Sequence, residues 1–494
     1  MRRSVVIVAI LALLAVSCGQ YQNVHTQGVA AGETTSGGAL TSGDTTSGDT
    51  TTGSGTTLPG STDTTGSTGT TIPGTTGTGS TDTTTGSGST GSTDTTGGTE
   101  TGTGDTTGGS DASGPTPGPS GPGDATGVTA TSITIGIHAP LTGAAPVKQT
   151  SFESGKDLYW KYGDNGQPVK IFGREVKVIF QDDHYNPSTA KTVCQQMAEE
   201  DHAFLLIGGA GTDQIVACAQ YSAGQGIPYL SAGVTKTQLA HFSNYFAISS
   251  TYSDQTHLLA DYIRNVLKIT DQSKIAMVAE DTPNFDDAVA AFQQEFPQAT
   301  APFRPGKNDA GESMANNLCT GPVKKFDVVF PLVSPIYYLH LAHAAQCHPH
   351  YVGIGLTEGI DAVANIGCPD TSNAEFFNPS PAWHDRDKFD KTYETAVAAA
   401  KKDNPNFAND DIVWLLWGLM KTVGVMLKAA GPDLTRQGFI SAAQTATVHS
   451  GVYPDLKFSP NNHFGTTQVH QLKNVCPESG GGYYVTERAF VNGF

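Results

Sequence analysis

Short apolar runs alternate with longer amphipathic segments along the chain from Thr131 onward. The short runs are rich in β-branched residues and predict strands at 133–137, 176–180, 204–207 and 228–230. The longer segments carry apolar residues at helical spacing and predict helices at 152–162, 188–200 and 213–223, the second of them capped by Ser188. Strict alternation of strand and helix is typical of βαβ units and predicts a mostly parallel sheet.

The same alternation restarts after Ser253, which predicts a second lobe. We expect helices at 254–266, 285–296 and 336–345, and strands at 274–278, 327–330 and 351–354. The segment from Thr131 to the end, about 365 residues, exceeds what one hydrophobic core usually holds. The predicted fold class is therefore α/β, with two lobes that are each a mostly parallel sheet flanked by helices.

A late helix is predicted at 410–430, with Asn409 as its N-cap and Gly431-Pro432 as its stop signal. Its apolar positions form one stripe, made of Val413, Leu416, Leu419, Met420, Val423 and Leu427. Such a stripe is more often core packing than a ligand site, so we assign this helix to the core.

The N-terminus has the pattern of an export signal. Two arginines precede an unbroken apolar run from Val5 to Val16, which is too short to span a bilayer comfortably. The ending Ala15-Val16-Ser17-Cys18 resembles the lipobox of bacterial lipoproteins, in which the cysteine is lipidated and becomes the new N-terminus. We therefore expect a signal peptide at 1–17 and a lipid anchor on Cys18, at the outer face of the cytoplasmic membrane. An ordinary secreted protein, with Cys18 incidental, is the alternative.

Residues 18–127 form a low-complexity segment of Thr, Gly, Ser and Asp with short internal repeats. Because it offers almost no apolar side chains to bury, we expect it to be a disordered linker. A flexible chain of ~100 residues has a root-mean-square span of about 50 to 60 Å, enough to carry a domain clear of a membrane. Its Thr and Ser density suits O-glycosylation, and an inert tether without sugars is equally compatible.

The net charge of −18 is unevenly distributed. The segment from Gly19 to Gly127 carries 10 acidic residues and neither Lys nor Arg, and the signal carries two arginines, which leaves −10 for the rest. A moderately acidic domain without a basic stripe argues against nucleic acid as a partner and against electrostatic docking on a membrane.

Six cysteines remain after Cys18, an even set in a compartment that permits disulfides. Sequence alone leaves 15 pairings open. We favour Cys194 with Cys218, because they fall on consecutive predicted helices. The other two expected pairs are Cys319 with Cys347 and Cys368 with Cys476.

Two turns that follow predicted strands are rich in glycine and hydroxyl residues: Gly208-Gly209-Ala210-Gly211-Thr212 and Ser231-Ala232-Gly233-Val234-Thr235. In open parallel sheets, ligands bind at the carboxyl ends of strands, where N–H groups at helix starts and short hydroxyls can hold an anion. The glycine spacing of dinucleotide sites is absent, so these turns fit a small carboxylate better. Glycine-rich turns can also be purely structural.

From Thr131 to about His470 the chain resembles the branched-chain amino-acid (Leu/Ile/Val) binding protein family, the type I periplasmic solute-binding lipoproteins of ABC importers. The resemblance rests on three loose motifs that occur in the family's order and spacing. They are the first strand and its loop at 135–143, the second loop at 230–239 and the first lobe crossing, Ser249-Ser250-Thr251-Tyr252-Ser253-Asp254-Gln255. It implies two lobes joined by three crossings, near Thr251, Phe377 and Val452.

The implied segments are a first lobe at 128–251 and 378–452 and a second lobe at 252–377 and 453–494.

The resemblance also implies a ligand site between the lobes. Thr212, after Ala210 and Gly211, stands where the family binds the ligand carboxylate with a serine hydroxyl. In the second loop, which begins at Ser231, Gly233 and Thr235 take the family's carbonyl and hydroxyl positions. Phe285 stands where the family has an aromatic from the second lobe, often tyrosine.

Glu358 matches the acid that pairs with the ligand's ammonium group, a role that requires a carboxylate because a buried ammonium needs an opposite charge. A solvated surface acid is the alternative. The family's glycine- and tyrosine-rich stretch after the strand at Phe330 is replaced here by Pro331-Leu332-Val333-Ser334-Pro335. This departure, and the missing phenolic hydroxyl at Phe285, leave the identity of the ligand side chain open.

Other chemistries have weaker support. His340, His343 and Cys347 share one face of a predicted helix, but Cys347 is expected in a disulfide, so we expect no metal site. No nucleophile elbow or zinc-protease motif occurs, and the acidic pairs Asp182-Asp183 and Asp410-Asp411 are of the kind found on loops and helix starts. We therefore expect no catalytic residue and no cofactor.

The sequence thus predicts a lipid-anchored solute-binding protein that captures an amino-acid-like or other small carboxylate ligand and delivers it to an ABC permease. A ligand-sensing surface receptor of the same fold is the alternative, since fold alone does not choose between them. An exported hydrolase is the least supported reading.

Overall fold

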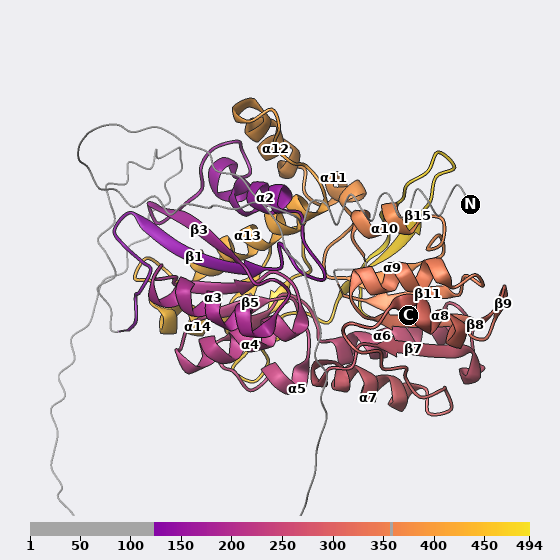
Figure 1. Ribbon diagram of the computed structural model, residues 1–494. Helices are drawn as coiled ribbons and strands as arrows, with labels where there is room; N and C mark the ends of the chain where they lie inside the picture. The colour runs from indigo at the N-terminus through magenta and orange to yellow at the C-terminus, as the bar shows by residue number, and fades with distance from the viewer. Residues whose placement is uncertain (1–122, 356–358) are drawn as a thin grey trace, which may run out of the picture. The chain divides into compact units, whose positions relative to one another are not determined.

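Two six-stranded sheets form the framework of the protein in the computed structural model, which describes residues 123–355 and 359–494 (Figure 1). Each sheet belongs to one lobe, so the predicted two-lobed α/β class is confirmed. The signal segment, Cys18, most of the expected linker and Glu358 lie outside the described residues.

The first sheet has the strand order β2-β3-β1-β4-β5-β6. Its strands are parallel except β2, which is antiparallel to β3. Their bounds are β1 Ser132–Ala139, β2 Lys170–Ile171, β3 Arg174–Asp182, β4 Leu205–Gly208, β5 Tyr229–Ser231 and β6 Tyr245–Ala247. In the central strand Ile135 pairs with Val178 on one side and with Leu205 on the other.

Helices cover both faces of this sheet. They are α2 Gln149–Tyr162, α3 Pro187–Glu199, α4 Thr212–Gly224, α5 Lys236–Leu239, α12 Thr392–Asp403, α13 Asp411–Ala429 and α14 Arg436–Ala443. Leu205 and Ile207 join the cluster that contains α2 and α13, whereas Leu206 between them joins the cluster that contains α3 and α4. The period of two along a strand thus sends alternate side chains into opposite cores.

Two of the expected helix caps are wrong. Asn186, not Ser188, caps α3: its side chain accepts hydrogen bonds from the backbone N–H groups of Ser188 and Thr189, and Pro187 occupies the first helical position. Asp410, not Asn409, caps α13 by accepting from the Val413 N–H. By length and composition α13 could cross a membrane, but most of its residues are buried in the first lobe, as expected for a core helix.

The second sheet has the order β16-β15-β12-β11-β10-β7, in which β15 and β16 are antiparallel to their neighbours. The strands are β7 Ile275–Ala279, β10 Val328–Leu332, β11 His350–Ile354, β12 Glu375–Asn378, β15 Val469–Val475 and β16 Tyr483–Val491. The helices of this lobe are α6 Tyr252–Asn265, α7 Asp286–Glu295, α8 Gly311–Leu318, α9 Pro335–Ala344 and α10 Asp361–Gly367.

Short elements complete the fold. They are the strand pairs β8 Cys319–Thr320 with β9 Val323–Lys324 and β13 Thr447–Val448 with β14 Leu456–Lys457, the short helix α11 Arg386–Phe389, and the 3-10 turns η1 Gln272–Lys274, η2 Pro283–Phe285 and η3 Trp383–Asp385.

The chain passes between the lobes where two of the three expected crossings lie. The first lies between β6 and α6, at Thr251, and the second follows Asn378 at the end of β12. The third comes later than expected: Tyr453 and Phe458 pack in the core of the first lobe, and Phe464 packs beside Tyr245. The chain therefore enters the second sheet only at Val469, so the expected boundary at residue 452 is about 15 residues too early.

All three expected disulfides are present: Cys194–Cys218, Cys319–Cys347 and Cys368–Cys476. The folded part also begins before residue 128. Asp124 forms an ion pair with the buried Arg436, and the Asp124 carbonyl accepts a hydrogen bond from the Arg436 N–H at 2.8 Å. The end of the expected linker at residue 127 is therefore a few residues too late.

Candidate ligand-binding site

The first glycine-rich turn joins β4 to α4 in the first lobe. Gly211 has φ 82°, a left-handed conformation that favours glycine, and a side chain there would collide with Gln214. This turn places Thr212 at the start of α4, buried, with its hydroxyl oxygen 3.2 Å from the hydroxyl oxygen of Tyr252. Ala210 lies half-buried in the same turn.

The second turn is packed tightly against the first crossing. A Cβ atom at Gly233 would lie 2.2 Å from the Ser250 carbonyl oxygen, so only glycine fits. The Gly233 N–H donates to the Ser249 hydroxyl at 2.7 Å, and the Ser231 hydroxyl lies 2.9 Å from that of Tyr245. These two polar groups are therefore engaged within the first lobe, while Thr235 is fully buried at the start of α5.

Tyr252 is the residue at which the expected site residues meet. Its N–H donates to the Val234 carbonyl of the second turn at 3.1 Å, and its hydroxyl adjoins Thr212. Its ring packs edge-on against Phe285 of the second lobe, with 5.7 Å between ring centroids. Tyr252 thus contacts Thr212 and Phe285 through its side chain and the turn at 233–235 through its backbone, so the structure brings these expected site residues together.

Two carboxylates join the lobes directly at this place. Asp213, in the first turn of α4, accepts hydrogen bonds from the Thr282 hydroxyl at 2.9 Å and the Asn284 side-chain nitrogen at 2.7 Å. Asp287, in the first turn of α7, accepts from the Lys236 N–H at 2.6 Å. Burial raises the pKa of Asp287, while N–H groups of α5 and α7 and the Thr235 hydroxyl favour its ionised form. The lobes are therefore in contact across the expected cleft.

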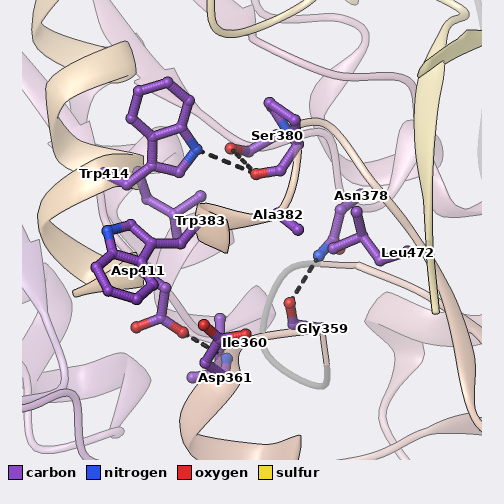
Figure 2. A pocket seen from close by; sticks show the side chains of 12 residues that line it. Gly359, Ile360, Asp361, Asn378, Ser380, Ala382, Trp383, Asp411, Trp414 and Leu472 are labelled. Carbon is purple, nitrogen blue, oxygen red and sulfur yellow. Dashed lines mark hydrogen bonds between the residues drawn. The ribbon is translucent and has the colours of Figure 1, made fainter. Parts of the chain in front are cut away.

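A small cavity lies between α10 of the second lobe and α13 of the first (Figure 2). The centre of a water-sized sphere can occupy about 20 Å³ of this cavity, so the cavity has room for one or two small polar groups. Its lining consists of Gly359, Ile360, Asp361, Asn378, Ser380, Pro381, Ala382, Trp383, Asp411, Trp414, Leu415 and Leu472. The Asp361 N–H donates to the Asp411 carboxylate at 2.5 Å, so this bond also joins the lobes.

The cavity's two carboxyl groups have strongly raised pKa values. Burial raises the pKa of Asp411 to about 7, and the neighbouring carboxylates of Asp361 and Asp410 contribute in the same direction. Burial likewise raises the pKa of Asp361 to about 6, although the Tyr484 N–H opposes the shift. Near pH 6.5 the pair therefore holds about one proton on average.

Several functional candidates were missed from the sequence. Asp213 and Asp287 lie in the first turns of their helices, where acidic residues are common because they interact favourably with the helix dipole. Their presence in the sequence therefore gave no separate indication of a functional role. Asp361 and Asp411 are 50 residues apart, and no local pattern indicates that they meet. Tyr252 had a detectable signal, since it is the aromatic residue of the crossing motif.

The remaining candidates are resolved as follows. Glu358 lies outside the described residues, one position before Gly359, which lines the cavity. His340 contacts Glu312, His343 contacts Asp370, and Cys347 is in a disulfide, so these three residues do not form a ligand set. His138 lies close to Cys194 and Cys218, but these sulfur atoms are bonded to each other.

Comparison with known proteins agrees with this architecture. Residues 132–312 match the family model described as periplasmic binding protein. An amino acid binding protein of Pseudomonas aeruginosa is 26% identical over 153 residues, which are 30% of this chain and 38% of that protein. The sequence match thus spans well under half of the curated relative's length.

Solved structures match over most of the chain. A fatty acid ABC transporter substrate-binding protein from Thermomonospora curvata has a TM-score of 0.61 and 17% identity, over 75% of this chain and 94% of its own. A solute binding protein of an ABC transporter from Rhodopseudomonas palustris, in complex with p-hydroxybenzoic acid, has a TM-score of 0.59 and 15% identity, over 74% and 98%.

A possible leucine/isoleucine/valine-binding protein from Rhodopirellula baltica has a TM-score of 0.57 and 16% identity, over 74% of this chain and 98% of its own. At these identities the likeness shows the fold, which is that of type I periplasmic binding proteins. The resemblance noted in the sequence is confirmed for the periplasmic-binding-protein fold and, over residues 132–312, for the family model.

Proposed function

We propose that this chain, which has the two-lobed fold of the periplasmic binding proteins and matches their family model, is an extracytoplasmic solute-binding protein. It captures an amino-acid-like or other small carboxylate ligand between its lobes for ABC-type import. The observation that carries the proposal is the convergence of Thr212, the turn at 233–235 and Phe285 around Tyr252, from loops of both lobes.

The chemistry of these loops favours an anionic group on the ligand. Thr212 brings a buried hydroxyl to the start of α4, where the first backbone N–H groups have no partner within the helix. At the start of α5 the Lys236 N–H and the Thr235 hydroxyl already face a carboxylate, that of Asp287, so this turn also favours negative charge. Of the similar solved structures, one is a fatty acid transporter's binding protein, one is a possible leucine/isoleucine/valine-binding protein and one is in complex with p-hydroxybenzoic acid, and all of these ligands are carboxylic acids. A carboxylate is the group that these ligands share with amino acids.

Phe285 supplies the apolar wall of the site from the second lobe. It is buried and lacks the phenolic hydroxyl of a tyrosine, so it can pack against a ligand but cannot donate a hydrogen bond to it. Glu358, which follows the last residue of β11 by four positions in the sequence, is proposed to contribute negative charge to the binding of an ammonium group when the ligand carries one.

Ligand entry requires the lobes to separate. The bonds of Asp213 to Thr282 and Asn284, and of Asp287 to the Lys236 N–H, must break as the crossings bend. The same bonds re-form over a bound ligand, so they contribute to closure.

Anchoring and delivery complete the proposal. Lipidation of Cys18 would hold the protein at the outer face of the cytoplasmic membrane, and the linker would let it reach an ABC permease. A radiolabelled-lipid incorporation assay tests the anchor: Cys18→Ala is expected to abolish labelling and release the protein from the membrane.

A thermal-shift screen of the full chain tests ligand capture. The compounds are L-amino acids, hydroxybenzoates and medium-chain fatty acids. A ligand present at 100 times its dissociation constant is expected to stabilise the protein by about 2.7 kcal/mol. If no carboxylate in the three classes shifts the melting temperature, the proposed function is wrong.

A further inference from the structure

We infer that the cavity between α10 and α13 is a subsite for a primary ammonium group, which the Asp361 and Asp411 carboxylates and the side-chain oxygen of Asn378 would hold. The inference rests on the proposed function, because it specifies which carboxylate ligands the protein selects: those that also carry an amine.

Asn378 provides the first argument. It is 2% exposed and lines the cavity, and its side-chain nitrogen donates to the Gly359 carbonyl at 3.2 Å (Figure 2). That bond fixes the orientation of the amide, and its oxygen has no hydrogen-bond partner. A buried acceptor without a donor is costly, so the site lacks a donor that a ligand can provide.

The charge around the cavity provides the second argument. Asp361 and Asp411 line it, and Asp410 adds a third carboxylate that bonds the Ser151 hydroxyl. Among the described residues, no lysine or arginine lies within ion-pair distance of these three carboxylates. Arg386 influences Asp361 from a distance but pairs with Glu394.

The basic group nearest to the pair is a histidine. Nε2 of His384 lies 3.3 Å from the Asp361 carboxylate, and burial lowers the pKa of this histidine, so it is mostly neutral at neutral pH. The described partners of the carboxylate cluster are therefore backbone N–H groups, the Ser151 hydroxyl and this histidine, which stabilise it without providing a full positive charge at neutral pH. An ammonium group bound in the cavity would supply the opposite charge that buried carboxylates require.

The size and position of the cavity define what fits. An ammonium group is close to a water molecule in size, so the cavity suits the head group and not a whole ligand. Asp361 and Asn378 belong to the second lobe, whereas Asp411 and Trp414 belong to the first. An amine bound there would contact both lobes and would favour their closure.

The raised pKa values of the two carboxyl groups agree with a site that is missing its cation. An ammonium group favours the ionised form of both acids, so its binding should release a proton from the pair near pH 6.5. The groups that face Asp411 and set this equilibrium are Asp361 and Asp410, with His384 and Arg386 acting on Asp361.

The experiment compares pairs of acids that differ in the amine alone, titrated calorimetrically into the full chain. The pairs are L-leucine with 4-methylpentanoate, L-phenylalanine with 3-phenylpropanoate, and 6-aminohexanoate with hexanoate. In at least one pair the amine-bearing member is expected to bind about tenfold or more tightly. At pH 6.5 its measured heat of binding should change with the ionisation enthalpy of the buffer, in the direction expected when the protein releases protons.

Asp411→Asn and Asp361→Asn are the test variants, and Asp433→Asn, which makes the same charge change at an exposed position, is the control. The preference for the amine and the proton release should persist in Asp433→Asn and be lost in both test variants. Thermal unfolding without ligand checks that each variant is folded. If Asp411→Asn does not fold, Asp361→Asn still tests the subsite.

The outcomes separate the two proposals. Acids that bind without preference for the amine, or a preference unchanged in both test variants, overturn the ammonium subsite and leave the proposed function intact. Failure of every acid and amino acid to bind overturns both. The last measurement uses ammonium chloride alone. If this salt stabilises the wild type against unfolding but does not stabilise Asp411→Asn, the subsite is supported and is assigned to a free cation instead of the ligand's amine.

Discussion

The carboxylate of Asp213 in the first lobe lies 2.7 Å from the side-chain nitrogen of Asn284 in the second lobe. The same carboxylate accepts a hydrogen bond from the Thr282 hydroxyl, which also caps the turn that carries Phe285. One acidic side chain therefore links the helix start that presents Thr212 to the segment that presents Phe285. At this position the contact between the lobes and the placement of these two candidate site residues depend on the same hydrogen bonds.

Removal of this link is expected to favour the open form. Asp213→Ala breaks two hydrogen bonds to a carboxylate, each worth about 1.5 to 3 kcal/mol in a closed, partly buried setting. The radius of gyration from X-ray scattering without ligand should increase, and ligand affinity should fall about tenfold or more. Asp281→Ala, which removes a carboxylate that pairs with Arg304 within the second lobe, is the control and should leave both unchanged. A closed scattering profile for Asp213→Ala would contradict the expectation.

The Asp411 carboxyl should make stability depend on pH. Its pKa is about 7 in the folded protein against 3.8 for an unperturbed group, so the folded state binds the proton more tightly. This stability contribution is complete below about pH 4 and is lost as the pH rises through 7. Between pH 5 and pH 8 the free energy of unfolding should fall by about 2 to 3 kcal/mol from this group.

Urea unfolding at both pH values measures the effect, and Asp411→Asn provides the comparison. The amide does not titrate, so the variant should lose most of this dependence while Asp433→Asn keeps it. Equal dependence on pH in the wild type and in Asp411→Asn would exclude the assignment of the raised pKa to this carboxyl.

The sequence predicted those parts of the fold in which local and tertiary requirements agree. In β1 the apolar residues Ile133, Ile135 and Ile137 alternate as a strand requires, and all three are buried. The strands β12 and β15 were not predicted, because polar residues occupy their buried positions. Glu375, His470 and Gln471 are buried there, and Gln471 and Tyr262 bond the Glu375 carboxylate.

The candidate site divides in the same way. Glycines at 211 and 233 mark turns whose geometry excludes a side chain, so the loops could be located from the sequence. The bonds across the cleft join residues 50 to 71 positions apart, such as Asp361 with Asp411 and Asp213 with Asn284. These contacts depend on how the two lobes pack against each other, and the hydrophobic pattern of the sequence within each lobe does not predict this packing.

Arg436 should control where the folded domain begins. It is 5% exposed, donates hydrogen bonds to the Ala203 and Phe204 carbonyls, and pairs with Asp124. Arg436→Ala removes the side-chain donor to two buried carbonyls and the charge partner of Asp124, so the free energy of unfolding should fall by about 3 kcal/mol or more. The residues around Asp124 should also detach.

Limited proteolysis with N-terminal sequencing tests the second effect. The protected fragment is expected to begin near Gly123 in the wild type and beyond Val128 in Arg436→Ala. Arg436→Lys keeps the charge but not the planar fork, so it should lose less stability than the alanine variant. Identical fragments from the wild type and Arg436→Ala would contradict a role for this pair in ordering the segment.

Thr212→Val tests most directly the anion-binding role that we propose for the first turn. The substitution keeps the branched shape of the side chain and removes the hydroxyl that faces Tyr252. If this hydroxyl donates to the ligand carboxylate, affinity for any carboxylate found in the screen should fall about tenfold or more. Thr237→Val, on the exposed side of α5, is the matched control and should bind normally. Tyr252→Phe keeps the ring contact with Phe285 and removes the other hydroxyl, so it distinguishes the two possible donors. If affinity falls in Thr212→Val and is unaltered in Tyr252→Phe, the hydrogen bond to the ligand comes from threonine. The reverse result assigns this bond to tyrosine.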